Sequence, residues 1–244
     1  MAATERSERP SERRAATRTA VVWEALRSVL DAPGDFLDIG GGTGGFAVRV
    51  AELGHRVSVI DPSPDALAAL DRRAQESGVA DRVAGQQGDL SSLLDVVPAG
   101  GVDVVLCHGV LEYVDDPGAA LATIGEVLRP GGTLSLLVAQ RHAAVVARAM
   151  AGHFTAAHGL LDGTEPVGRS GRRFTLEEIT GLLDTAHFTT RSVHGVRVFA
   201  DLVPGSLLDL EPGSTRALVD LERAVSTRPE YLPLATQVHV LATH

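Results

Sequence analysis

The order of hydrophobic and polar residues predicts strands and helices that alternate along most of the chain. Short runs rich in Val, Ile and Leu are typical of strands and occur at 36–39, 56–60, 82–87, 102–107 and 133–139. The segments between them show helical spacing of apolar positions, through Ala51, over 65–75 and over 117–128. Another helix is expected from Ala15 to just before Pro33. Such alternation predicts an α/β fold with an open, mostly parallel sheet and helices on both faces.

Beyond Gln140 the pattern is less regular. It indicates helices over 141–151, 175–186 and 214–225, and strands over 191–200 and 237–243. The two late strands are expected to close the sheet as an antiparallel pair, which gives seven strands in one domain over 15–244.

Two segments do not fit this pattern. Residues 1–14 carry charges of both signs and almost nothing apolar, so we expect a disordered or loosely attached arm. Residues 152–173 contain five glycines without regular apolar spacing and are longer than most connections in compact domains. We interpret this stretch as a mobile lid or substrate loop.

Composition narrows the class of protein. The chain has 244 residues, is 44% hydrophobic and carries a formal net charge of −9, with all its basic residues Arg and none Lys. The acidic balance disfavours a DNA-binding protein, and no apolar run is long enough to span a bilayer. The single Cys107 cannot form an internal disulfide, so the cytosol is the expected compartment. No metal site is predicted.

The most informative motif lies between a predicted strand and a predicted helix. Asp38 is followed by Ile39 and then by five glycines in six positions, Gly40 to Gly45. Glycines there let the backbone turn sharply and approach a ligand closely. The motif also satisfies G-x-G-x-x-G, which alone leaves a nicotinamide-dependent oxidoreductase as a remote alternative. An acidic residue two positions before the first glycine argues against a dinucleotide site.

Two further carboxylates follow strand ends. Asp61 lies 21 residues after Gly40 and ends the second strand, where a carboxylate can accept both hydroxyl hydrogens of a ribose. Capping of the next helix is the competing role, for which Ser63 is better placed. Asp89 follows Gly88 after the third strand. For Asp89 alone, an ordinary turn role is equally supported.

Together with Leu128-Arg129-Pro130-Gly131-Gly132, these motifs resemble the Rossmann-like class I S-adenosylmethionine (SAM)-dependent methyltransferases. The segment 107–117, the stretch 135–154 and Gly195-Val196-Arg197-Val198-Phe199 resemble the tRNA 5-carboxymethoxyuridine methyltransferases in particular. That family esterifies a carboxymethoxy group on a wobble uridine. The resemblance implies SAM as cofactor and the following binding residues: Arg18, Asp38, Gly40, Gly41, Gly42, Asp61, Gly88, Asp89, Leu90 and His108.

The methyl acceptor is less determined than the cofactor. A carboxylate is ionised at neutral pH and requires an arginine to hold it, for which Arg141, Arg148 and Arg197 are candidates. A hydroxyl acceptor would instead require a base such as His142. Where the family is rich in Lys, residues 159–175 carry only Arg169, Arg172 and Arg173. The alternatives are therefore a methyltransferase of a small acidic metabolite and, more remotely, a catalytically silent SAM-binding regulator.

Overall fold

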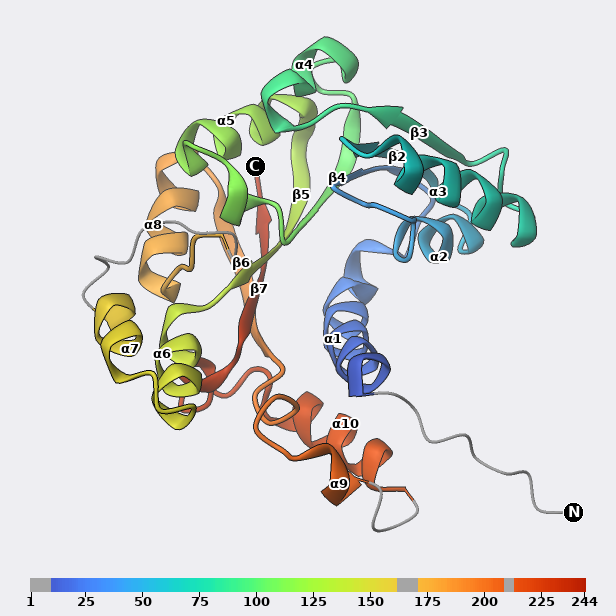
Figure 1. Cartoon of the computed structure of the whole chain (residues 1–244). Coiled ribbons are helices and arrows are strands. Elements are labelled where there is room, and N and C mark those ends of the chain that lie inside the picture. The colour runs from blue at the N-terminus through green and yellow to red at the C-terminus, as the bar shows by residue number, and fades with distance from the viewer. Residues whose placement is uncertain (1–9, 162–170, 209–212) are drawn as a thin grey trace, which may run out of the picture. The chain divides into compact units, whose positions relative to one another are not determined.

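The computed structural model describes residues 10–161, 171–208 and 213–244 (Figure 1). The strands are β1 (Asp35–Ile39), β2 (Arg56–Asp61), β3 (Val83–Gln87), β4 (Val102–His108), β5 (Leu128–Ala139), β6 (Thr189–Val196) and β7 (Gln237–Thr243). The α-helices are α1 (Pro10–Leu26), α2 (Ala47–Glu52), α3 (Pro64–Glu76), α4 (Leu93–Val96), α5 (Pro117–Val127), α6 (Arg141–Met150), α7 (Phe154–Leu161), α8 (Leu176–Thr185), α9 (Gly205–Leu208) and α10 (Ser214–Val225). Short 3₁₀ turns are η1 (Arg27–Val29), η2 (Leu90–Ser92), η3 (Leu111–Tyr113) and η4 (Leu232–Leu234).

The strands form one seven-stranded sheet in the order β3-β2-β1-β4-β5-β7-β6. The pairs β1–β2, β1–β4, β2–β3 and β4–β5 are parallel. β7 runs against β5: the Gly131 N–H donates to the His244 carbonyl, and the Gln140 N–H donates to the Thr236 carbonyl. The mostly parallel sheet is as predicted.

The strand order has a direct consequence for where a ligand can bind. The chain moves outward from β1 to β3 and then returns to β4 on the other side of β1. Right-handed crossovers therefore place α2 and α3 on one face and α4 and α5 on the other. Figure 1 shows α2 and α3 grouped beside β2 and β3, away from α4 and α5. The carboxyl ends of β1 and β4 border the crevice at this switch point.

The core lies along the central strands. On β4, Val104, Val105, Leu106 and Cys107 are all buried, as expected for a parallel strand covered on both faces. Burial raises the pKa of the Cys107 thiol to about 12, so this cysteine is a core residue and not a thiolate nucleophile at neutral pH. Within the described residues, no helix is long and apolar enough to cross a membrane.

Residue contacts divide the chain into two compact units. Among the described residues, the larger unit comprises 26–139, 171–193 and 240–244. The smaller unit comprises 10–25, 140–161, 194–208 and 213–239. The larger unit contains β1 to β5 and the predicted glycine turn. The smaller unit contains α1, α6, α7 and α10.

Two predicted boundaries differ from the structure. Helix α1 begins at Pro10, so residues 10–14 of the predicted arm are helical, while 1–9 lie outside the described residues. The segment 152–173, expected to lack regular structure, contains α7 at Phe154–Leu161. Its Ala157 and Leu160 are buried, so apolar packing forms this helix despite the neighbouring glycines. Residues 162–170 lie outside the described residues.

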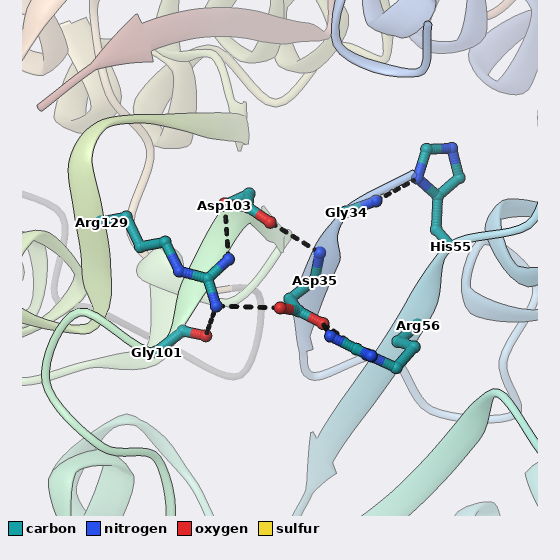
Figure 2. A network of polar contacts seen from close by, with 7 residues as sticks. All are labelled: Gly34, Asp35, His55, Arg56, Gly101, Asp103 and Arg129. Carbon is teal, nitrogen blue, oxygen red and sulfur yellow. Dashed lines mark hydrogen bonds and ion pairs between the residues drawn. The ribbon is translucent and has the colours of Figure 1, made fainter. Parts of the chain in front are cut away.

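A network of charges joins the amino-terminal ends of the parallel strands (Figure 2). Asp35 on β1 binds Arg56 at 2.7 Å and Arg129 at 2.9 Å. Arg129 also binds Asp103 at 2.6 Å and donates to the Gly101 carbonyl at 2.9 Å. Hydrogen bonds from Arg56 lower the pKa of Asp35, and hydrogen bonds from Arg129 lower the pKa of Asp103. This network stabilises β1, β2, β4 and β5 at the edge opposite their carboxyl ends.

Arg129→Ala is expected to lower the melting temperature at pH 7, because it removes a shared partner of two carboxylates. A carboxylate with a lowered pKa contributes stability above its ordinary value of 3.8 and loses it as the pH falls through the folded-state pKa. The difference from wild type should therefore shrink below pH ~4. Thermal unfolding from pH 3 to 8 measures this, with the exposed Arg72→Ala as control. A difference that does not change with pH would contradict the prediction.

Candidate functional site

The turn after β1 requires residues without side chains. Gly40, Gly42 and Gly44 have φ angles of 67°, 55° and 77°, a left-handed conformation that other residues rarely adopt. A Cβ on Gly41 would lie 2.6 Å from the Cγ of Asp38 and 2.9 Å from a methyl of Val59. The glycines are therefore needed for conformation at three positions and for space at the fourth.

Asp38 is packed against this turn at Gly41 and is 4% exposed. Within the turn, the Gly40 N–H donates to the Ile60 carbonyl at 2.7 Å, and the Gly44 N–H donates to the Gly41 carbonyl at 3.0 Å. The turn is thus attached to the end of β2. An alanine at position 41 would overlap the Asp38 side chain, so the glycine cradle requires Gly41 for the turn to lie this close to Asp38.

Asp61 connects the glycine turn to the end of β2. Its Oδ2 accepts the Gly42 N–H at 2.9 Å, and its Oδ1 accepts the Ser63 N–H at 2.9 Å. Each carboxylate oxygen has a second acceptor position, so both can still accept a hydroxyl hydrogen. The Ser63 hydroxyl accepts the Ala66 N–H at 3.2 Å and caps α3. Helix capping is therefore the role of Ser63, as the sequence indicated.

Asp89 caps the 3₁₀ turn η2, which is the structural role that its sequence context left open beside cofactor binding. Its Oδ1 accepts the Ser91 N–H and hydroxyl and the Ser92 N–H, which makes it the cap of η2. These hydrogen bonds, the Ser91 hydroxyl first, lower the pKa of Asp89 and keep it ionised. Among the described residues its Oδ2 has no protein partner. One oxygen therefore fixes the loop while the other remains an acceptor.

A cavity of about 700 Å³ opens at the carboxyl ends of β1, β2 and β4, within the larger unit. This volume is in the usual range for small-molecule sites. Five of the predicted cofactor residues line it: Gly40, Asp61, Gly88, Asp89 and Leu90. The glycine cradle, the spare acceptors of Asp61 and the cavity volume together fit a nucleoside-bearing cofactor. No group of acidic, His or Cys side chains suited to a metal ion occurs among the described residues.

One wall of this cavity, which the sequence did not indicate, is formed by the segment after β4 and by α5. It consists of Gly109, Val110, Tyr113, Val114, Asp115, Asp116, Ala119, Ala120 and Thr123. Most of these residues carry no recognisable chemistry in the sequence. The available indication was topological, because the loop after β4 borders the switch point next to β1.

His108 lies at the end of β4 but is not among the residues lining the cavity. Its Nε2 is 2.8 Å from the Ser135 hydroxyl, and its ring meets the Phe46 ring edge to face at 5.1 Å between centroids. In the structure His108 therefore packs between β5 and the residue before α2. Asp38, Gly41 and Gly42 likewise shape the turn without lining the cavity.

The remaining predicted residues belong to the smaller unit. Arg18 is on α1 and is half-buried. Arg141 and Arg148 are half-buried on α6, where His142 is exposed. Arg197 follows β6, and its Nε lies 3.4 Å from Asp201 Oδ2. Arg148 also borders a second hollow, of about 470 Å³, between α6 and α7.

Comparison with known proteins agrees with this geometry. Residues 37–134 match a family model described as a methyltransferase domain. The chain is 31% identical to the tRNA 5-carboxymethoxyuridine methyltransferase of Escherichia coli strain K12, over 92% of this chain and 87% of that protein.

Two solved structures share the fold. The cyclase SpnF has a TM-score of 0.64 at 22% identity and covers 94% of this chain and 81% of its own. The 1,6-didemethyltoxoflavin-N1-methyltransferase of Burkholderia thailandensis, solved with S-adenosylhomocysteine, has a TM-score of 0.57 at 22% identity and covers 94% and 78%. The chain is a SAM-dependent methyltransferase and belongs to the family that includes the E. coli tRNA 5-carboxymethoxyuridine methyltransferase.

Proposed function

We propose that this enzyme methylates the carboxylate of a 5-carboxymethoxy group on a wobble uridine of tRNA. The observation that carries the proposal is the extent of the likeness to the E. coli enzyme. The methyltransferase-domain match ends at residue 134, whereas the likeness to that enzyme covers 92% of the chain. It therefore includes segments of the smaller unit, outside the cofactor-binding strands. A tRNA substrate implies a cytoplasmic enzyme.

For the cofactor, we assign roles according to the geometry of the larger unit. Asp61 binds the ribose hydroxyls through the acceptor positions that Gly42 and Ser63 leave unused. Asp89 accepts the adenine amino group through Oδ2, beside Gly88 and Leu90. Asp38 supports the turn on which the methionine end of the cofactor lies.

Two further roles rest on the family resemblance alone. Arg18 binds the cofactor carboxylate, and His108 contributes to the pocket through its contacts with Ser135 and Phe46. In this arrangement His108 supports the end of β4 from outside the cavity lining and does not act as a base. Removing its ring would remove one aromatic contact of Phe46, the residue before α2.

Bound SAM would supply a methyl group attached to a positively charged sulfur. The acceptor oxygen forms the new O–CH₃ bond while the C–S bond breaks, and the sulfur keeps the electron pair of the broken bond. The protein must hold the two reacting atoms in line, which is worth roughly 7–11 kcal/mol. A carboxylate acceptor has no proton to lose at pH 7. The chain then needs a cation to orient the acceptor and no general base.

Asp61→Ala is expected to weaken SAM binding by about 100-fold, because two hydrogen bonds to a charged acceptor are lost and each is worth at least about 1.5 kcal/mol. It also removes the acceptor of the Gly42 N–H. Isothermal titration calorimetry with SAM measures the loss. Asp65→Ala, an exposed carboxylate in the first turn of α3, is the matched control. Equal affinities for all three proteins would refute the ribose assignment.

The acceptor can be tested with tRNA from an E. coli strain that lacks its own 5-carboxymethoxyuridine methyltransferase. We expect the wobble nucleoside to gain one methyl group as a base-labile ester, detected by mass spectrometry after digestion. Between pH 6 and 8 the single-turnover rate should not change, since a carboxylate is fully ionised there. A rate that increases with pH would indicate a hydroxyl acceptor and a base. Methylation of small carboxylic acids but not of tRNA would favour the metabolite alternative.

The charge of the chain predicts weak electrostatic attraction to tRNA. The formal net charge is −9, and one of the few cations of the segment 159–175, Arg172, donates to the Asp115 carbonyl at 3.4 Å. Arg169 lies outside the described residues. The salt dependence of tRNA affinity should therefore be shallow, with a slope of about 2–3 and not the ~10 of a strongly electrostatic binder. Filter binding across a salt series measures it, and a steep slope would contradict the prediction.

A further inference from the structure

Arg197 has an unusual backbone conformation. Among the described residues that are not glycine, only His187 and Arg197 have a positive φ, at 62° and 59°. His187 follows α8 and its N–H donates to the Asp184 carbonyl, an ordinary end for a helix. Arg197 instead follows β6, where no helix end explains the conformation. A residue with a Cβ is strained there, and glycine would relieve the strain.

The loop that holds this conformation is fixed by a buried carboxylate. Glu222 on α10 is 0% exposed. Its Oε2 accepts the Val198 N–H, and its Oε1 accepts the N–H groups of Phe199 and Ala200, all at 2.8 Å. Three N–H donors compensate the burial of one negative charge. Glu222 thus fixes the three residues that follow Arg197.

Contacts on the other side fix Arg197 itself. Its carbonyl accepts the Thr236 N–H at 3.3 Å, and the Thr236 hydroxyl lies 2.9 Å from that carbonyl and 2.8 Å from Asp201 Oδ2. Asp201 in turn lies 3.4 Å from Arg197 Nε, at ion-pair distance but without hydrogen-bond geometry.

Apolar packing adds to these contacts. Val198 is buried against Val225 and Ala235, and the ring of Phe199 contacts the ring of Tyr231. The loop is therefore rigid on both sides of the arginine.

This arrangement leaves the terminal nitrogens of Arg197 available. Its Nη1 and Nη2 have no partner among the described residues, and the side chain is 25% exposed. Two parallel N–H groups on a planar guanidinium match the two oxygens of a carboxylate. By contrast, Arg141 and Arg148 are carried on the regular helix α6, and neither has a positive φ. The backbone at position 197 would be better served by glycine, and surrounding contacts hold the arginine in its strained conformation. This indicates that the arginine is present for its side chain.

We propose that Arg197 binds the acceptor carboxylate and that Glu222, acting through the 198–200 amides, is the residue that positions it. The proposal rests on the carboxylate acceptor proposed above. It selects one of the three candidate arginines and assigns a role to a buried glutamate that is far from Arg197 in the sequence. Glu222 itself does not contact the acceptor.

The first test replaces Arg197 with glycine. Because glycine relieves the positive φ, Arg197→Gly should melt at the same temperature as wild type or higher, with unchanged SAM affinity. Its KM for tRNA bearing the carboxymethoxy group should rise about 10- to 100-fold, the loss expected for a charge-assisted pair. His187→Gly, which relieves the other positive φ, is the matched control and should change stability alone. An Arg197→Gly enzyme with wild-type KM would overturn the proposal.

A comparison of two tRNAs identifies the anion. Affinity is measured by filter binding for tRNA with and without the carboxymethoxy group. If Arg197 holds the carboxylate, Arg197→Gly should weaken binding of the modified tRNA alone. Equal weakening for both tRNAs would mean that Arg197 contacts a backbone phosphate and would overturn the proposal. Methylation of the modified tRNA by the wild-type enzyme tests the acceptor separately. If the wild-type enzyme does not methylate this tRNA, the proposed function is wrong, whatever the role of Arg197.

The role of Glu222 is tested through a double-mutant cycle. In Glu222→Gln, the side-chain NH₂ faces a backbone N–H donor, so the loop loses part of its support. KM for the modified tRNA should rise in the wild-type background and show no further rise in the Arg197→Gly background. Equal effects in both backgrounds would show that Glu222 acts on stability alone. If Glu222→Gln does not fold, the same double-mutant cycle is measured with Thr236→Val. Thr236 directly precedes β7, and its hydroxyl contacts the Arg197 carbonyl.

Discussion

The cofactor site depends on one close approach, that of the backbone after β1 to the carboxylates of Asp38 and Asp61. A side chain at position 41 would overlap Asp38, and the Gly42 N–H is bound by Asp61. Because β1 and β2 are parallel neighbours, their carboxyl ends meet at one edge of the sheet. The glycine turn, the Asp61 carboxylate and the cavity therefore depend on the same contact between β1 and β2.

At the opposite edge of the sheet, where the parallel strands begin, the charged side chains are paired with one another. There Asp35, Asp103, Arg56 and Arg129 are bound to one another (Figure 2). At the carboxyl edge, by contrast, Asp61 and Asp89 each keep acceptor positions that the protein does not use. Charges at one edge stabilise the strands, and charges at the other are available for chemistry.

The fold alone does not determine the reaction. The cyclase SpnF shares the architecture at a TM-score of 0.64, as expected where function is carried by the site and not by the fold. The acceptor must be recognised by residues outside the common cofactor frame. In this chain the strained loop after β6, supported by Glu222 and Thr236, is such a feature. Its rigidity has a cost in backbone strain that a purely structural loop would avoid with glycine.

The sequence by itself determined the α/β alternation, the glycine turn and the carboxylates at the ends of β2 and β3, because each depends on local spacing and on short-range turn chemistry. The cofactor followed from the resemblance of these motifs to those of the class I methyltransferases. The sequence did not predict α7, where burial of Ala157 and Leu160 overrode local composition. Nor did it predict that α1 begins at Pro10. It did not indicate the cavity wall of Gly109 to Thr123, because most of these residues have no distinctive chemistry until the strand order places them beside β1. Nor did it distinguish Arg197 from Arg141 and Arg148. Only the tertiary structure brought Glu222 from α10 to the 198–200 amides, because hydrogen bonds between residues more than 20 positions apart leave no periodic pattern in the chain.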